Sequence, residues 1–209
     1  TEIIPSAVDV TERVNAERRK DILLAELEHR VKNILATVQA VARFTARMSL
    51  DKDHMAENLI SRLSAISRTH EALTSSGWQG KSLRTLLEAE VAPYLDTGND
   101  RFIYSGDEIA LPPDIAMSLG LALHELATNA AKYGAYSNDS GRVEVTVQGR
   151  DGQVQMLEWR ERNGPQVVPP KREGFGTFLI QTLLKRELDA SIEVFYEEAG
   201  LRCIVRSIG

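Results

Sequence analysis

The sequence has little cysteine, no excess of positive charge and no long apolar run, and each of these shortages argues against a class of protein. Its 209 residues contain a single cysteine, Cys203. One thiol excludes an internal disulfide and a metal cluster held by several cysteines, and it favours a reducing compartment. We therefore expect a cytoplasmic protein.

Basic residues do not outnumber acidic ones. The formal net charge is −5, and no region carries a sustained basic run, which argues against a nucleic-acid-binding surface. No stretch approaches the roughly eighteen consecutive apolar residues that a membrane-spanning helix needs, and no apolar signal-peptide core lies near the start. We expect no nucleic-acid partner and no membrane span in these residues.

The composition suits one or two ordinary domains. Hydrophobic residues make up 43% and charged residues 26% of the chain, which is enough to build proper cores. There is no internal repeat and no low-complexity tract. The first residue is Thr rather than Met, so we expect the sequence to be a piece of a longer chain.

A long helix is predicted at the N-terminal end, from Asp9 to about Met48. Within it, apolar residues alternate at spacings of three and four over about three heptads, the pattern of a helix in a bundle. The members of this seam are Leu24, Leu27, Val31, Ile34, Val38, Val41 and Thr45.

His29 lies on the side of this helix opposite the seam. With Leu24 at heptad position a, His29 falls at position f, so we expect its ring in solvent. The side chains around it are those of Glu28, Arg30, Lys32 and Asn33. Basic and amide groups around an exposed imidazole suit an approaching phosphate, and the alternative is an ordinary solvated histidine.

A second helix follows a turn at residues 49–53 and carries a matching seam. The seam residues are Leu59, Leu63, Ile66, His70 and Leu73. Two antiparallel helices with matching seams form a hairpin that still has an apolar face to cover. Pairing with a second copy completes a four-helix bundle, so we expect a homodimer.

Residues 75–80, Ser-Ser-Gly-Trp-Gln-Gly, break the helical pattern and mark a domain boundary. Beyond it, helices are predicted at 82–95, 112–133 and 175–187, and strands at 101–104, 142–148, 153–161, 191–196 and 202–208. An Asp151-Gly152 turn joins two alternating strands as a hairpin. This order of elements predicts a sheet with helices on one face, an α/β sandwich.

Three polar residues of the helix at 112–133 are spaced to share one face: Glu125, Asn129 and Lys132. A carboxylate, an amide and an ammonium group on one face suit a metal-bridged phosphate, because Mg²⁺ prefers oxygen ligands and is often held by few protein groups plus phosphate oxygens. The alternative is a solvated helix face.

A glycine-containing segment, Gly174-Phe-Gly-Thr177, opens the helix predicted at 175–187. Glycines let the backbone approach a ligand closely, and free N–H groups at a helix start attract anions. The preceding Pro-rich loop, 164–174, has no periodicity and resembles a lid. A plain surface loop is the competing account.

Together these segments resemble the sensor histidine kinases of the HWE family. ELEHRVKNILATVQAVA resembles the phosphoacceptor box, and LALHELATNAAKYGA resembles the N box with its distinctive histidine at His124. LEWRERNGP supplies the Trp-x-Glu of the family name as Trp159 and Glu161. GFGTFLIQ resembles the second glycine box. DVTER, at residues 9–13, also resembles the exit from a PAS-type sensor domain.

The resemblance covers residues 20–209 and implies an α+β fold. Residues 1–19 would be a linker helix from a sensor domain. Residues 20–76 would be the dimerisation and histidine phosphoacceptor hairpin, a four-helix bundle on dimerisation. Residues 77–209 would be a Bergerat-type ATP-binding sandwich.

In such a kinase, His29 would be phosphorylated by ATP and would pass the phosphoryl group to an Asp of a response regulator receiver domain. Imidazole has a reference pKa of about 6.5, so an unperturbed ring is mostly the neutral nucleophile at pH 7. The resemblance makes Asn129 the Mg²⁺ ligand, with Glu125 acting on the metal's water. Lys132 and Tyr133 would face the phosphates or ribose.

The same resemblance assigns the glycine-rich segment to the triphosphate. Gly174, Gly176 and Thr177 would frame it, and Lys171 and Arg172 would be charge partners on the lid.

The sequence departs from the commoner histidine kinases at two places. Arg30 stands where those kinases have an acid after the phosphorylated histidine, so the base must come from elsewhere, and Glu28, Glu125 and His124 are unranked candidates. The adenine-reading Asp-x-Gly is replaced by a stretch in which either Asn163 or Glu161 takes that role; strand register favours Asn163. The structural alternatives are that His124 is a core histidine and that Trp159 is a core aromatic residue.

Two other functions compete with an autokinase. A phosphotransfer or binding module with a degenerate ATP fold is disfavoured by the intact Glu-x-x-x-Asn and Gly-x-Gly-Thr motifs. An ATPase that uses Glu125 to activate water is disfavoured by the box around His29.

Overall fold

The computed structural model describes residues 11–48, 52–75, 81–95, 100–169, 176, 185 and 190–207. The chain divides into two compact units, Thr1–Arg47 and Met48–Gly209. The predicted segment boundaries at residues 20 and 77 stay predictions.

The first unit consists of most of one long helix, α1 (Thr11–Met48). Its predicted seam includes exposed apolar side chains, since Leu24, Leu27 and Val31 are 48%, 57% and 47% exposed. His29 is exposed as well. A Glu28–Lys32 ion pair at 3.8 Å joins neighbours on the same helix.

The second unit begins with α2 (Lys52–Ser75), followed by α3 (Leu83–Val91), the short 3₁₀ helix η1 (Ala92–Tyr94) and α4 (Pro113–Lys132). The predicted helix over 82–95 becomes a 3₁₀ turn after Val91, where Pro93 has no N–H to donate to the preceding turn of an α-helix. In α4, Pro113 occupies the first turn, where a missing N–H does no harm.

All five predicted strands are present. They are β2 (Phe102–Gly106), β4 (Arg142–Arg150), β5 (Gln153–Arg162), β6 (Ala190–Glu197) and β7 (Gly200–Ser207). They form one sheet in the order β2-β4-β5-β7-β6, in which β2 and β4 run parallel and the other neighbours antiparallel. A small second pair, β1 (Lys81–Ser82) with β3 (Ala110–Leu111), and a 3₁₀ turn, η2 (Ala135–Ser137), were not predicted.

The hairpin predicted at Asp151-Gly152 is confirmed. Both residues have positive φ, 53° and 78°, as a two-residue turn between right-twisted strands requires. Of the helix predicted over 175–187, the described residues are Gly176 and Lys185, and both are helical.

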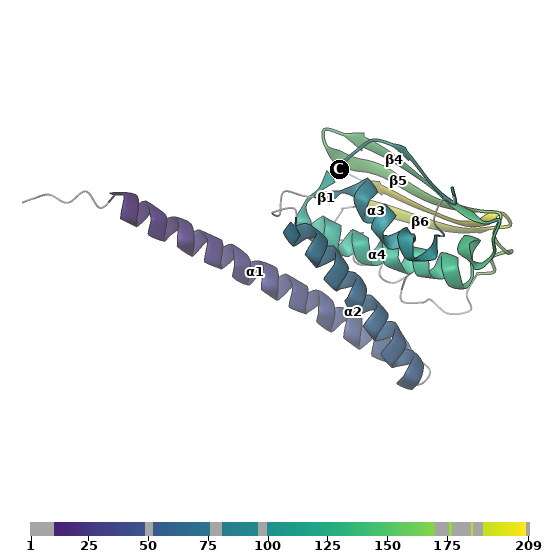
Figure 1. The fold of residues 1–209 in the computed structure, drawn as a ribbon, viewed down its shortest axis with the longest axis horizontal. Helices are drawn as coiled ribbons and strands as arrows, with labels where there is room; N and C mark the ends of the chain where they lie inside the picture. Colours follow the sequence, from purple (N-terminus) through teal and green to yellow (C-terminus); the bar gives the residue numbers. More distant parts are fainter. Residues whose placement is uncertain are drawn as a thin grey trace, which may run out of the picture. The chain divides into compact units, whose positions relative to one another are not determined.

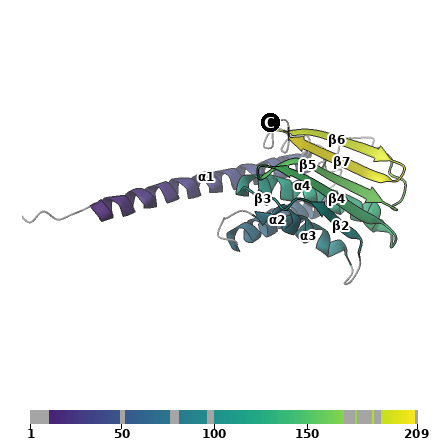
Figure 2. The same ribbon diagram turned by 90° about the horizontal axis from the view of Figure 1, so that it is seen from above.

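The sheet of the second unit has α3 and α4 on one face, with α2 packed against α4 (Figures 1 and 2). Buried residues alternate along β4, where Val143, Val145 and Val147 occupy every second position, so one face of this strand is apolar and packs into the core. Trp159 is fully buried on β5. The predicted α+β fold, with helices on one face of a sheet, is confirmed.

Among the described helices, none is both long and apolar enough to cross a membrane.

Candidate active site

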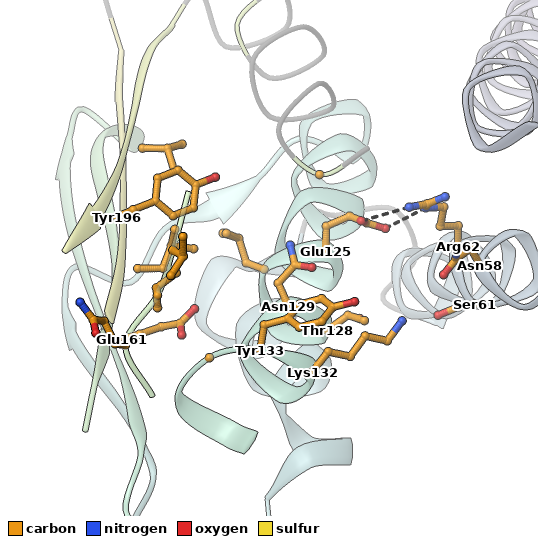
Figure 3. Close-up of a pocket in the computed structure, with 18 residues that line it drawn as sticks. Asn58, Ser61, Arg62, Glu125, Thr128, Asn129, Lys132, Tyr133, Glu161 and Tyr196 are labelled. Atoms are coloured by element: carbon orange, nitrogen blue, oxygen red, sulfur yellow. Dashed lines mark hydrogen bonds and ion pairs between the residues drawn. The ribbon is translucent and has the colours of Figure 1, made fainter. Parts of the chain in front are cut away.

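A cavity of about 570 Å³ opens in the second unit between α4, α2 and the sheet end formed by β5, β6 and β7 (Figure 3). This size suits a small-molecule ligand, since such pockets usually measure about 300–1,000 Å³.

Helix α4 supplies one wall of this cavity. Glu125, Asn129 and Lys132 all line it, as their i, i+4, i+7 spacing predicts, and Tyr133 follows them. Figure 3 shows the amide of Asn129 and the phenol of Tyr133 at the centre of the site. Glu125 is only 8% exposed, so a solvated helix face does not describe this residue.

Helix α2 adds a buried arginine to the cavity lining, next to α4. Arg62 Nε donates to Glu125 Oε1 at 2.9 Å, and Arg62 Nη2 donates to Glu125 Oε2 at 3.3 Å (Figure 3). Both side chains are about one-tenth exposed. Sequence reasoning missed Arg62, because it assigned α2 to the helical bundle and the pair joins residues 63 positions apart.

His124, the residue before Glu125, is 5% exposed and has protein partners at both ring nitrogens. Its Nε2 lies 3.0 Å from Ser61 Oγ of α2, and its Nδ1 lies 3.0 Å from Glu90 Oε2 of α3. Arg68 Nη2 lies 3.2 Å from the same Glu90 oxygen and 3.3 Å from Nδ1. His124 is therefore a buried junction of α2, α3 and α4, and it does not line the cavity.

Glu161 closes the sheet side of the cavity and is 2% exposed. Burial raises the pKa of its carboxyl group, although the Ala135 N–H and the Trp159 indole N–H donate to it at 2.8 and 3.4 Å. Gly134 permits this approach, because a Cβ built there would lie 2.0 Å from Glu161 Oε2. The buried Trp159 thus fixes the neighbouring acid.

Asn163 does not line the cavity and is exposed. Its φ is +56° and its carbonyl accepts a hydrogen bond from Asn138 at 3.1 Å. Strand β5 ends at Arg162, so the alternation that placed Asn163 and Glu161 on one face no longer holds at Asn163. The structure brings Glu161 to the cavity instead.

Gly176 also lines the cavity, close to α4. A Cβ built on it would lie 3.3 Å from Glu125 Cβ and 3.4 Å from Asn129 Nδ2. The small residue lets its backbone approach the two candidate metal-site residues. Gly174, Thr177, Lys171 and Arg172 lie outside the described residues.

His29 belongs to α1, in the other compact unit, and its side chain is exposed there.

Comparison with known proteins extends these observations. Residues 26–108 match the model of the HWE histidine kinase family. Two curated relatives are blue-light-activated histidine kinases. That of Brucella ovis is 35% identical over 196 residues, which is 92% of this chain and 40% of the relative. That of Brucella anthropi is 38% identical over 197 residues, which is 93% of this chain and 40% of the relative.

Solved structures show the same fold. The Erythrobacter litoralis EL346 blue-light activated histidine kinase aligns with 87% of this chain and 60% of its own, at 20% identity and a TM-score of 0.54. Its separate histidine kinase domain aligns with 81% of this chain and 93% of its own, at 14% identity and a TM-score of 0.53.

The chain spans 40% of the length of the curated relatives that it matches. The family model and these relatives agree, and the chain belongs to the HWE histidine kinase family.

Proposed function

We propose that this chain is the kinase core of a sensor histidine kinase, which phosphorylates His29 with ATP and passes the phosphoryl group to an Asp of a response regulator in two-component signalling. The observation that carries the proposal is the shared wall of Glu125, Asn129 and Lys132 in a cavity of ligand size.

The residues of this wall fit a magnesium nucleotide. Mg²⁺ takes oxygen ligands and usually keeps phosphate oxygens and waters, so the Asn129 amide oxygen is the proposed ligand and Glu125 acts on the metal's water. The ammonium group of Lys132 suits the phosphates, and Tyr133, which is 70% exposed at the rim, suits phosphate or ribose. Close backbone approach at Gly176 suits a triphosphate.

We propose Glu161 as the residue that reads the adenine amino group, because its carboxylate lines the sheet side of the cavity and Asn163 does not. Gly174 and Thr177 are proposed to frame the triphosphate with Gly176, as the family resemblance implies.

The proposed reaction needs an exposed nucleophile. A neutral imidazole nitrogen of His29 forms a bond to the γ-phosphorus while the bond from that phosphorus to the β–γ bridging oxygen breaks, and ADP leaves. Catalysis of this kind rests mainly on positioning and charge stabilisation. Glu28 and Glu125 remain the candidates for the group that takes the imidazole proton, because the third one, His124, is 5% exposed and does not line the cavity.

We propose three partners: a response regulator receiver domain, a second copy of the chain through the α1 seam, and an N-terminal sensor domain of PAS type. We propose a cytoplasmic location for this kinase core. Support for the seam is the exposure of Leu24, Leu27 and Val31, and support for the sensor domain is the resemblance of residues 9–13 to a PAS exit.

The test is incubation of the whole chain with Mg²⁺ and γ-labelled ATP. We expect a protein-bound label that is lost in acid, is stable in alkali and is absent from His29→Gln. His54→Gln is the matched control, because His54 is another exposed histidine on a helix, and it should keep the label.

The competing functions give different results in the same experiment. Nucleotide binding with release of free phosphate and no protein label would favour the ATPase. Absence of both binding and label would favour a degenerate binding module.

A further inference from the structure

Consecutive residues of α2 bind consecutive residues of α4. Ser61 contacts His124, and Arg62 pairs with Glu125. The first contact therefore fixes the backbone next to the arginine that holds the cavity carboxylate. His124 and Glu125 cannot shift independently of this part of α2.

The hydrogen bonds of His124 define its tautomer. Glu90 Oε2 lies 3.0 Å from His124 Nδ1, and a carboxylate is an acceptor only, so Nδ1 carries a proton. Arg68 Nη2 lies 3.3 Å from Nδ1 but is a donor only, so its hydrogen bond goes to Glu90 Oε2, at 3.2 Å. In the neutral ring Nε2 is then the acceptor for the Ser61 hydroxyl. The result is a directed chain from Ser61 through His124 to Glu90, whose side chain is 2% exposed.

A second contact keeps α2 close to α4. A Cβ built on Gly120, one turn before His124, would lie 2.7 Å from Thr69 Oγ1 and 3.2 Å from Thr69 Cγ2. Thr69 is 2% exposed. The glycine therefore permits a close approach of the two helices, and α2 is docked along more than one turn.

Docking of α2 determines the orientation of Glu125. Two parallel N–H···O bonds from a guanidinium fix the plane of a carboxylate as well as its position. Removal of one partner from a buried ion pair leaves an uncompensated charge, which is costly. The orientation of the Glu125 carboxylate thus depends on Arg62, and the position of Arg62 depends on the docking of α2 against α4.

We propose that His124 is a positioning residue, which docks α2 through the Ser61–His124–Glu90 chain so that Arg62 orients Glu125 at the wall of the nucleotide site. It rests on the proposed function, in which Glu125 acts on the metal's water. His124 touches neither nucleotide nor reacting atoms, and it acts through Arg62.

The test measures nucleotide affinity and chemistry separately in the whole chain. Calorimetry gives the Kd for ADP with Mg²⁺, and single-turnover labelling at saturating ATP gives the rate constant. We expect His124→Ala and Arg62→Gln to lower the rate constant by about 10- to 100-fold, the cost of a small misplacement of a catalytic group, with the Kd within about threefold of wild type. His124→Asn should recover part of the rate, because its amide can still donate to Glu90.

A matched pair of serines provides the control. Ser61→Ala removes the hydroxyl at His124 and should lower the rate, whereas Ser64→Ala changes an exposed serine of the same helix and should leave it unchanged. Nitrogen NMR of the wild-type imidazoles needs no variant, and we expect one ring with a protonated Nδ1 and an acceptor Nε2.

Three results would overturn the proposal. These are unchanged rates in His124→Ala and Arg62→Gln, faster phosphorylation in either variant, or an Nε2–H tautomer at His124. Glu125→Gln separates this failure from failure of the proposed function, because a fully active Glu125→Gln would refute the role of Glu125 itself.

Discussion

Helices α1 and α4 both carry apolar residues at regular spacing and a candidate functional group, yet they place them in opposite environments. On α1, Leu24 and Leu27 are 48% and 57% exposed, and His29 is exposed. On α4, Leu121 and Leu123 are each 1% exposed, and Glu125 is buried between α4 and α2.

The difference follows from what each group has to do in the proposed reaction. A phosphorylated histidine must be reached by a nucleotide and afterwards by a receiver domain, so it needs an accessible position. Residues that hold metal and phosphate need fixed geometry and limited water, because electrostatic interactions strengthen in a low-dielectric site. A helix held between a sheet and a second helix provides that rigidity.

The largest effect is expected on the buried helix, from Asn129→Ala. Loss of the proposed metal ligand should lower the labelling of His29 by about a hundredfold or more, because a metal supplies several kcal/mol of charge stabilisation in phosphoryl transfer. Labelling with γ-labelled ATP measures it. Asn138→Ala is the control, because it changes an amide outside the cavity lining, and it should keep the label. Full labelling of Asn129→Ala would show that the metal ligand is wrongly assigned.

A large effect is also expected on the exposed helix, from Leu27→Glu. If the seam of α1 joins two copies, a charge there should weaken the dimer by about a hundredfold, because each buried leucine contributes about 1.5–3 kcal/mol and an unpaired buried charge costs more. Light scattering coupled to size exclusion should show twice 23.2 kDa for the wild type and 23.2 kDa for the variant. Ile22→Glu is the control, since Ile22 is 66% exposed but lies opposite the seam. A monomeric wild type would contradict the dimer.

A smaller effect is expected across the cavity from α4. Glu161→Ala should weaken ATP binding by about 10- to 100-fold, the equivalent of one hydrogen bond to a charged group. Asn163→Gly keeps the positive φ of 56° and should change affinity by less than about threefold. Calorimetric titration of both variants decides between the two residues. A larger loss of ATP affinity in Asn163→Gly than in Glu161→Ala would show that Asn163 reads the adenine.

The smallest effect is a pH dependence of stability. The folded-state pKa of Glu161 is raised by burial above its ordinary value of 4.5, so the folded state binds this proton more strongly than the unfolded state. Its stabilising contribution is present below 4.5 and is lost as the pH rises through the folded pKa. Denaturant unfolding should show the stability of wild type minus that of Glu161→Gln falling as the pH rises across that window. A difference independent of pH would contradict it.

The regular spacing of apolar residues along the chain predicted most of the helices and strands. The alternation of Val143, Val145 and Val147 and the positive-φ turn at Asp151-Gly152 depend on local sequence, so strand and hairpin were predictable. The i, i+4, i+7 spacing of Glu125, Asn129 and Lys132 likewise requires only that their segment be a helix.

Two features of the site were not predictable from local sequence. The apolar spacing of α2 fits a bundle partner or α4 equally well, so the pairing of Arg62 with Glu125 becomes visible only in three dimensions. The strand alternation that placed Asn163 on the same face as Glu161 also stops one residue too early. Strand β5 ends at Arg162, and Asn163 adopts a left-handed conformation beyond it.

The most direct measurement is mass spectrometric mapping of the phosphate after the whole chain has reacted with Mg²⁺ and ATP, with the protein kept at alkaline pH. The account predicts the mass of one phosphate on the peptide that contains His29, and none on that peptide in Asn129→Ala. A phosphate on another residue, or an unmodified His29 in a chain that binds nucleotide, would contradict it.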